Sequence, residues 1–314
     1  MSATSRKADD QNPESTMEGL PAVVNTKHQA ELARSPRHEI ARMQDAWFFG
    51  RSDLEDRRII YPEMEEKDIT DAFRRIRTKI LQKSQSSNQV VLVAGLEEGN
   101  GASFVTNNIA AAFAFDESKT ALLLDCDIKN PGISFRNNEV STAGLIEYLE
   151  GDEEREIGVE EIIHPSGIRR LRIVPVGDER EDSVEYFTSM KMRHLIETVK
   201  ARYSERYIFL NSPPVLKSAD AEILVELCDY VVLVVPYGKY TEARIAEAAK
   251  AIGKEKLLGV VFNNQPRIPS NLSIRSMMPW KNIKSIFSKR RNQSEDSEDK
   301  NHTESLESNQ ESNS

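Results

Sequence analysis

Short apolar segments alternate with helical segments along the middle of the chain, and this alternation is the strongest constraint on its fold. Strands are expected at residues 89–94, 120–124, 171–176, 207–210, 230–235 and 257–262. Helices are expected between them, at residues 102–114, 144–149, 184–202, 219–227 and 241–252. Strands that are apolar on both faces are typical of parallel sheets covered on both sides. The sequence therefore predicts an α/β fold, with a parallel sheet covered by helices on both faces.

An amphipathic helix is expected ahead of the first strand, over residues 68–82. Its apolar side chains recur at spacings of four, three and four residues, at Ile69, Phe73, Ile76 and Ile80. This spacing puts them on one face of a helix. Basic side chains occupy the opposite face.

A glycine-rich turn follows the first strand, at the edge of the sheet where parallel α/β proteins bind ligands. Such a turn, leading into a helix, offers backbone N–H groups to an anion. Against the phosphate-loop pattern G-x-x-x-x-G-K-[ST], Gly101 and Ser103 hold the second glycine and the hydroxyl positions, and Ala102 stands where lysine is expected. Turns of this kind also occur without a ligand, so the turn alone leaves the function open.

Polar residues also end the second and fourth strands. Asp125 and Asp127 follow the second strand, where buried carboxylates need a cation or a hydrogen-bonding partner. Capping of the following turn is the alternative role for this pair. The fourth strand ends in Asn211, at a position where phosphate-loop NTPases use an aspartate near Mg²⁺.

Together these elements resemble the bacterial tyrosine kinase (BY-kinase) family of capsule and exopolysaccharide biosynthesis. The resemblance spans residues 68–265 and rests on four stretches, 71–77, 99–103, 125–131 and 210–220. They are similar to the family's E-x-x-R-x-x-R helix, its phosphate loop, its D-x-D-x-R-x-P motif and its hydrophobic-D-S-P-P motif. Residues 202–208 make the chain look nearest to the soluble autokinases of exosortase-linked exopolysaccharide loci.

The resemblance implies a phosphate-loop NTPase fold of the Min, Par and BY-kinase type, with ATP and Mg²⁺ as cofactors. It implies nucleotide-binding residues at Gly99, Asn100, Gly101, Ala102, Ser103, Asn211 and Asn263, the last facing the adenine. Asp125 and Asp127 would be the catalytic carboxylates, and Ser103 and Asp125 the magnesium ligands. Asp71, Arg74 and Arg77 would mediate ring assembly.

Several residues depart from the family pattern. Ala102 replaces the phosphate-binding lysine, and Asn211 replaces the aspartate linked to Mg²⁺. In the loop, Glu98 stands for proline and Asn100 for glutamate. No tyrosine follows Tyr240, whereas family kinases phosphorylate a tyrosine cluster near the C-terminus. We therefore expect weak nucleotide binding at best.

Three functional hypotheses follow. The first is a non-catalytic or feeble kinase-like subunit in polysaccharide biosynthesis and export. The resemblance implies a membrane polysaccharide copolymerase that regulates chain length as its partner, and assembly with itself or with an active paralogue. The second is an active protein-tyrosine autokinase, and the third is a partitioning or positioning ATPase.

Five regions are expected along the chain. A disordered region is predicted for residues 1–38, a docking arm for 39–67 and the kinase-like domain for 68–266. Residues 267–291 form a basic segment with interleaved aromatic and apolar side chains. This pattern suits an anionic membrane surface or a partner helix, or a basic linker. Residues 292–314 are predicted to be an acidic disordered tail.

Charge and composition exclude other classes. The net charge of −9, of which the tail supplies −6, argues against a nucleic-acid partner. Two cysteines fit a reducing compartment, and residues 1–15 lack the apolar core of a signal peptide. No apolar run approaches the length of a membrane span. A cytoplasmic protein is expected, peripheral at the inner face of the plasma membrane if a partner holds it there.

Overall fold

The computed structural model describes residues 48–85, 87–133, 135, 143–151, 157–177 and 184–266. The chain divides into two units, residues 1–44 and 45–314, and all described residues lie in the second. The predictions for residues 1–38, 267–291 and 292–314 lie outside the described residues, as does the first part of the predicted docking arm. Within the described part of the chain, no helix has the length and apolar character that crossing a membrane requires.

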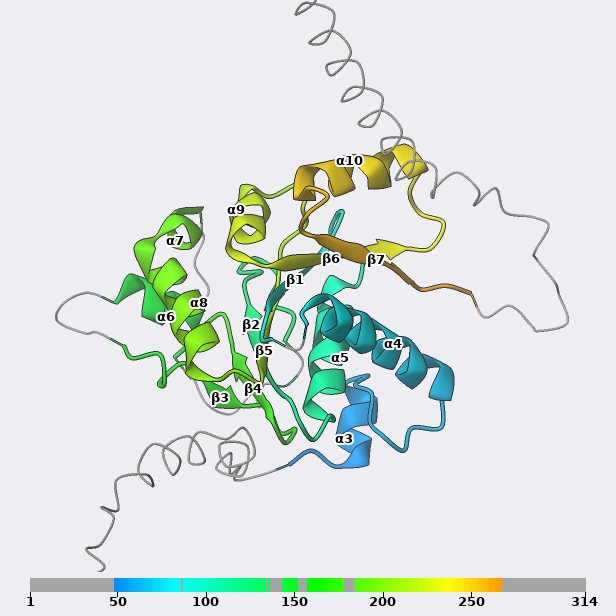
Figure 1. Cartoon of the computed structure of the whole chain (residues 1–314), viewed down its shortest axis with the longest axis horizontal. Helices are drawn as coiled ribbons and strands as arrows, with labels where there is room; N and C mark the ends of the chain where they lie inside the picture. Colours follow the sequence, from blue (N-terminus) through cyan, green and yellow to red (C-terminus); the bar gives the residue numbers. More distant parts are fainter. Residues whose placement is uncertain are drawn as a thin grey trace, which may run out of the picture. The chain divides into compact units, whose positions relative to one another are not determined.

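The described residues form one sheet of seven strands in the order β3-β4-β2-β5-β1-β6-β7 (Figure 1). The strands are β1 (Val90–Gly95), β2 (Thr120–Asp125), β3 (His164–Pro165), β4 (Leu171–Val174), β5 (Arg206–Asn211), β6 (Tyr230–Pro236) and β7 (Leu257–Asn263). All neighbouring pairs are parallel except β3 and β4. The predicted α/β fold is therefore confirmed, with one antiparallel strand added at the edge.

Helices cover both faces of this sheet, and the side chains of each strand alternate between the two. The helices are α3 (Arg51–Asp56), α4 (Lys67–Lys83), α5 (Ala102–Ala114), α6 (Leu145–Glu150), α7 (Val184–Thr188), α8 (Met190–Arg202), α9 (Ala219–Leu227) and α10 (Glu242–Ile252). Val91 and Val93 of β1 pack in the apolar cluster that includes side chains of α3, α4 and α5. Val90 and Leu92 pack in the apolar cluster that includes side chains of α6, α8, α9 and α10.

Two local features differ from the sequence-based expectations. Strand β3 was not predicted, because two residues carry no hydrophobic period. The single helix expected over residues 184–202 is two helices, which meet at Ser189. The Ser189 hydroxyl accepts a hydrogen bond from the backbone N–H of Met192 at 3.2 Å and donates one to the carbonyl oxygen of Tyr186 at 2.6 Å. This side chain therefore caps the start of α8.

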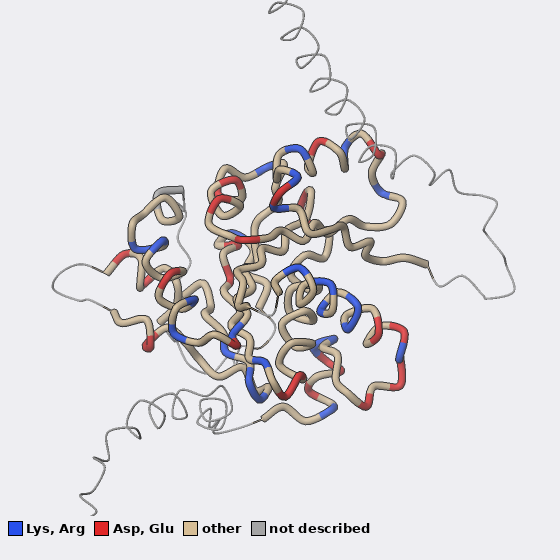
Figure 2. The backbone as a smooth tube through the Cα atoms, in the orientation of Figure 1, with Lys and Arg blue, Asp and Glu red and all other residues tan. Residues whose placement is uncertain are grey.

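The amphipathic helix α4 packs on α5 through its apolar face. Phe73 and Ile80 are buried, and the rings of Phe73 and Phe104 lie edge to face with centroids 6.0 Å apart. Basic residues recur along α4 (Figure 2), and Arg74, Arg75 and Lys79 are exposed. The segment before α4 is held on α5 by Asn108, whose side chain accepts from the N–H of Ile60 at 2.8 Å and donates to Arg58 O at 3.1 Å.

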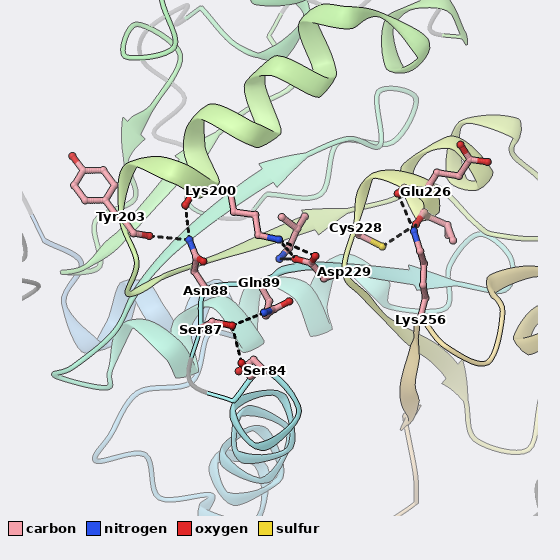
Figure 3. A network of polar contacts seen from close by, with 12 residues as sticks. Ser84, Ser87, Asn88, Gln89, Lys200, Tyr203, Glu226, Cys228, Asp229 and Lys256 are labelled. Atoms are coloured by element: carbon pink, nitrogen blue, oxygen red, sulfur yellow. Dashed lines mark hydrogen bonds and ion pairs between the residues drawn. The ribbon is translucent and has the colours of Figure 1, made fainter.

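A polar network ties the elements together at the amino ends of the strands (Figure 3). Asp229, just before β6, accepts hydrogen bonds from Lys200 of α8 at 2.6 and 2.8 Å and from the backbone N–H of Val90 at 2.8 Å. Asn88 donates to the carbonyl oxygens of Lys200 at 2.5 Å and Tyr203 at 3.0 Å. These contacts join α8, β1 and β6 at the edge of the sheet opposite the glycine-rich turn.

Candidate functional site

The glycine-rich turn lies between β1 and α5, as predicted. Gly99 and Gly101 have backbone φ angles of +70° and +81°, in the left-handed region that favours glycine. Gly101 is the residue that precedes α5, so the turn leads directly into the helix N-terminus. The turn therefore has two left-handed glycines and leads into a helix, as the phosphate-loop pattern requires, although Ala102 begins the helix in place of lysine.

Side chains that follow β6 and end β7, the two strands next to β1 on one side, hold this turn. The Tyr240 hydroxyl donates to Asn100 Oδ1 at 3.0 Å and to Glu97 Oε2 at 3.3 Å. Asn263, at the end of β7, donates through Nδ2 to the carbonyl oxygen of Asn100 at 3.2 Å. A Cβ added at Gly101 would lie 2.1 Å from Asn263 Nδ2. The structure thus brings Asn263, which the resemblance places at the adenine, against the backbone of the turn.

Two basic side chains near the turn pair with Glu97. Arg244 donates to Glu97 Oε1 at 3.3 Å, and the ammonium of Lys217 lies 3.9 Å from Oε2. The hydrogen bond from Arg244 is the largest of the effects that lower the pKa of Glu97. Arg244 also pairs with Glu247 at 2.7 Å.

Asp125 ends β2 and is fully buried, and both of its carboxylate oxygens are hydrogen-bonded within the chain. Oδ1 accepts from Asn211 Nδ2 at 2.7 Å and from the N–H of Asp127 at 3.3 Å. Oδ2 accepts from the N–H groups of Gly132 at 2.7 Å and Ile133 at 3.0 Å. Burial raises the pKa of Asp125, and these four hydrogen bonds oppose that rise.

Asp127 caps the turn that follows β2, which is the alternative role that the sequence left open. Its Oδ1 accepts from the backbone N–H of Asn130 at 3.2 Å. Burial, with added repulsion from Asp125, Glu98 and Asp220, raises the pKa of Asp127 to about 6. A cavity of about 170 Å³ opens beside it, between this turn and the start of α9.

Asn211 ends β5 beside Asp125, with which it is in register. Its amide donates to Asp125, and its Oδ1 lies 3.4 Å from the Thr106 hydroxyl that donates to it. The sequence shows Asn211 as the loss of a negative charge. The structure shows in addition that its amide supplies a hydrogen-bond donor, which an ionised aspartate lacks.

Gly132 is a residue of this site that the sequence reasoning missed. A Cβ added to it would lie 2.1 Å from Ser103 Oγ and 3.0 Å from Asn211 Nδ2. Its carbonyl oxygen accepts from Asn107 Nδ2 of α5 at 2.8 Å. The sequence shows a glycine directly after Pro131, which indicates a tight turn. It does not show that this glycine packs against Ser103, because the two residues are far apart in the chain.

The residues present do not fit a Mg²⁺ ion held between Ser103 and Asp125. All the hydrogen-bonding capacity of the Asp125 carboxylate is taken up by donors of the chain. The backbone of Gly132 lies against the Ser103 hydroxyl. The lysine that would contact the β- and γ-phosphates is absent, so the phosphate side of the site is incomplete as well.

The three residues predicted to mediate assembly have different environments. Asp71 and Arg74 are both exposed and lie 3.4 Å apart on α4. Arg77 instead donates to the carbonyl oxygen of Ala112 at 2.8 Å and lies 3.9 Å from Asp116. Its guanidinium is therefore directed to the end of α5 in the same chain.

The fold and the glycine-rich turn define the class of this protein. The strand order, the helices on both faces and the β1–α5 turn are those of a phosphate-loop NTPase fold of the kind predicted. Comparison with known proteins then shows which family the chain is similar to. No family model matches the chain.

Curated relatives match the kinase-like part of the chain. The tyrosine-protein kinase CpsD of Streptococcus agalactiae is 29% identical over 200 residues, which cover 63% of this chain and 84% of that protein. The tyrosine-protein kinase YwqD of Bacillus subtilis is 29% identical over 199 residues, 62% of this chain and 81% of YwqD. The succinoglycan biosynthesis transport protein ExoP of Rhizobium meliloti is 28% identical over 188 residues, 57% of this chain and 22% of ExoP.

Solved structures agree. The chimerical protein CapA2B2 shares the fold, with a TM-score of 0.58 and 24% identity over 70% of this chain and 93% of its own. The BceF tyrosine kinase domain has a TM-score of 0.52 and 26% identity over 63% of this chain and 78% of its own. By these likenesses the chain is similar to the bacterial tyrosine kinase family. ATP and Mg²⁺ are the cofactors of that family.

Proposed function

We propose that this chain is a non-catalytic or feebly catalytic kinase-like subunit in exopolysaccharide or capsule biosynthesis and export. One observation carries the proposal: Asp125, the first catalytic carboxylate of the family motif, is hydrogen-bonded to the amide of Asn211 at 2.7 Å. Phosphoryl transfer depends on positioned positive charge around the phosphates. The lysine would supply part of that charge, and Mg²⁺ held by the carboxylate would supply the rest. A site that lacks the lysine, and whose carboxylate is hydrogen-bonded by the chain, supplies little positive charge.

The loss of the lysine lowers the free energy gained on binding a phosphate. A hydrogen bond to a charged phosphate contributes about 1.5–3 kcal/mol to binding, and Ala102 supplies none. The carboxylates of Glu98, Asp125 and Asp127 add repulsion toward a triphosphate when no metal is held. Weak binding of ATP and Mg²⁺ is therefore part of the proposal.

The role in polysaccharide biosynthesis rests on the relatives. ExoP is named for the biosynthesis and transport of succinoglycan, a polysaccharide, and CpsD is named as a tyrosine kinase. By this likeness we assign the chain a membrane-embedded chain-length regulator as its partner, and a location at the cytoplasmic face of that membrane. The net charge of −9 favours a protein partner over a nucleic acid.

Assembly with copies of itself or with an active paralogue is the second part of the proposal. Exposed Asp71 and Arg74 on α4 supply a charged pair that a neighbouring subunit could contact. The exposed Arg75 and Lys79 add positive charge along the same helix (Figure 2). A subunit of this kind would contribute a binding face to the assembly rather than chemistry.

The decisive experiment measures tyrosine phosphorylation and nucleotide binding with the purified full chain. ATP and Mg²⁺ are added, phosphotyrosine is followed by mass spectrometry, and ATP binding is followed by calorimetry, with CpsD as the positive control. We expect no phosphotyrosine at the level of CpsD and weak binding. Robust phosphotyrosine that disappears in Asp125→Asn would establish the autokinase hypothesis instead. Tight ATP binding with hydrolysis and without phosphotyrosine would favour the positioning ATPase.

A further inference from the structure

We propose that the turn formed by residues 125–133, here called the Asp125 turn, is held closed over the phosphate-loop site by the chain's own groups. Its conformation would then be independent of nucleotide and metal. The contacts of Asp125, Asn211, Gly132 and Ser103 carry this inference. It rests on the proposed loss of kinase chemistry and adds a physical cause for it.

The first step is the hydrogen bonding of Asp125. This carboxylate and the Asn211 side chain are each 1% exposed, so an unsatisfied charge there would be costly. Four N–H donors satisfy it: the amide of Asn211 and the backbone groups of Asp127, Gly132 and Ile133. A metal ion has no role left in stabilising this carboxylate.

The second step is the packing of Gly132 on Ser103. A Cβ at residue 132 would lie 2.1 Å from Ser103 Oγ and 2.3 Å from Ser103 Cβ, closer than a Cβ atom approaches non-bonded atoms in proteins. The φ angle of Gly132 is not positive, so the lack of space for a side chain, and not the backbone conformation, requires glycine here. Glycine therefore lets the Asp125 turn lie directly on the hydroxyl that the family offers to Mg²⁺.

The third step is the anchoring of the turn on both sides. The N–H of Gly132 donates to Asp125 of β2, while its carbonyl oxygen accepts from Asn107 of α5 at 2.8 Å. The turn is thus bonded to a central strand and to the helix that begins at the phosphate loop. To admit a metal ion at Ser103, the chain would have to break contacts on both sides of this one residue.

Hydrogen exchange of the full chain tests the inference, read at the amides of Gly132 and Ile133. In the wild type we expect slow exchange that does not change when Mg-ATP is added. Gly132→Ala should speed exchange by about tenfold or more, because the new methyl group meets Ser103. Gly259→Ala is the matched control, since a Cβ there meets nothing within 4 Å.

Two further variants keep the test decisive. Adding Ser103→Gly to Gly132→Ala removes the two atoms closest to the methyl group and leaves Asn211 Nδ2 at 3.0 Å, so it should restore most of the slow exchange. Asn107→Ala removes the bond to Gly132 O without adding volume, so it should also speed exchange even if Gly132→Ala does not fold. Exchange in Gly132→Ala equal to that of Gly259→Ala, or unchanged exchange in Asn107→Ala, would overturn the inference.

The inference and the proposed function can fail separately. If Mg-ATP slows exchange in the wild type while no phosphotyrosine forms, a ligand closes the turn and the inference is overturned, but the non-catalytic role stands. If phosphotyrosine forms while exchange is unaffected by Mg-ATP, the closed turn stands and the proposed function falls.

Discussion

The amide nitrogen of Asn211 lies 2.7 Å from Asp125 Oδ1, and the two residues are register partners at the ends of neighbouring strands. A neutral amide donor therefore stands beside a buried carboxylate at the centre of the site. This pairing makes Asn211 a stabilising residue as well as a departure from the family pattern.

Asn211→Asp should lower the stability of the protein at pH 7. The substitution replaces a donor with a second carboxylate beside the buried Asp125, and we expect a loss of about 2–4 kcal/mol in the free energy of unfolding. Urea unfolding at pH 7 and at pH 5 measures it, and the loss should shrink at the lower pH as one carboxylate becomes protonated. Asn263→Asp, at a partly exposed asparagine, is the control, and an equal loss in both variants would argue against a special role for the Asn211–Asp125 bond.

Ala102→Lys combined with Asn211→Asp should restore Mg²⁺-dependent ATP binding. The lysine supplies the missing phosphate contact, while the aspartate supplies metal-site charge and releases Asp125 from its amide partner. We expect the double variant to bind about tenfold or more tighter than either single variant, because both changes act on the same bound nucleotide. Titration of fluorescent ATP into the four proteins, with and without Mg²⁺, measures this. A double variant that binds no ATP would mean that the site is lost and not only altered.

Asp127→Asn should stabilise the protein at neutral pH. The pKa of Asp127 is about 6 in the folded protein, against its ordinary 3.8, so the folded state holds this proton more tightly than the unfolded state. Stability from this group is present at acidic pH and is lost as the pH rises through about 6. Asparagine keeps the oxygen that accepts from Asn130 and does not ionise.

The difference in unfolding free energy between Asp127→Asn and the wild type should therefore grow from near zero at about pH 4 to about 1–2 kcal/mol at pH 7. Denaturant unfolding across this range measures it. A difference that does not vary with pH would show that Asp127 is not the titrating group.

Arg74→Glu and Arg77→Glu should have different effects. Arg74 is exposed and forms an ion pair with Asp71 within the same helix, so reversing its charge should leave the melting temperature unchanged. Because Arg74 belongs to the proposed assembly surface, the same change should weaken self-association. Arg77 holds α5 through Ala112 O, so its reversal should cost about 1–2 kcal/mol of stability. Analytical ultracentrifugation and thermal melting measure the two effects, with Lys254→Glu, at an exposed lysine outside α4, as the control. Unchanged assembly in Arg74→Glu would remove α4 from the proposed interface.

The fold was predictable because its signals are local. Each parallel strand is apolar in its own sequence, and the period of α4 is visible in Ile69, Phe73, Ile76 and Ile80. The break at Ser189 was not predictable, since a serine within a helical pattern does not by itself end a helix. Strand β3 was missed because its pairing with β4 comes from tertiary contact.

The candidate site was predictable in part. The sequence places Gly101, Asp125 and Asn211 at the carboxyl ends of strands, and the structure brings these strand ends to one edge of the sheet. The close approach of Gly132 to Ser103 has no such local signal, because it depends on the path of a turn between distant residues. The direction of Arg77 toward α5 likewise follows from packing and not from helix spacing.

The network around Asp229 has a practical consequence for all of these experiments. It ties α8, β1 and β6 at the amino ends of the strands (Figure 3). The residues to be substituted around the glycine-rich turn lie at the carboxyl ends of the strands. The anchoring network and the candidate site thus lie at opposite ends of one sheet, so residues of the candidate site can change while the contacts that hold the other end stay in place.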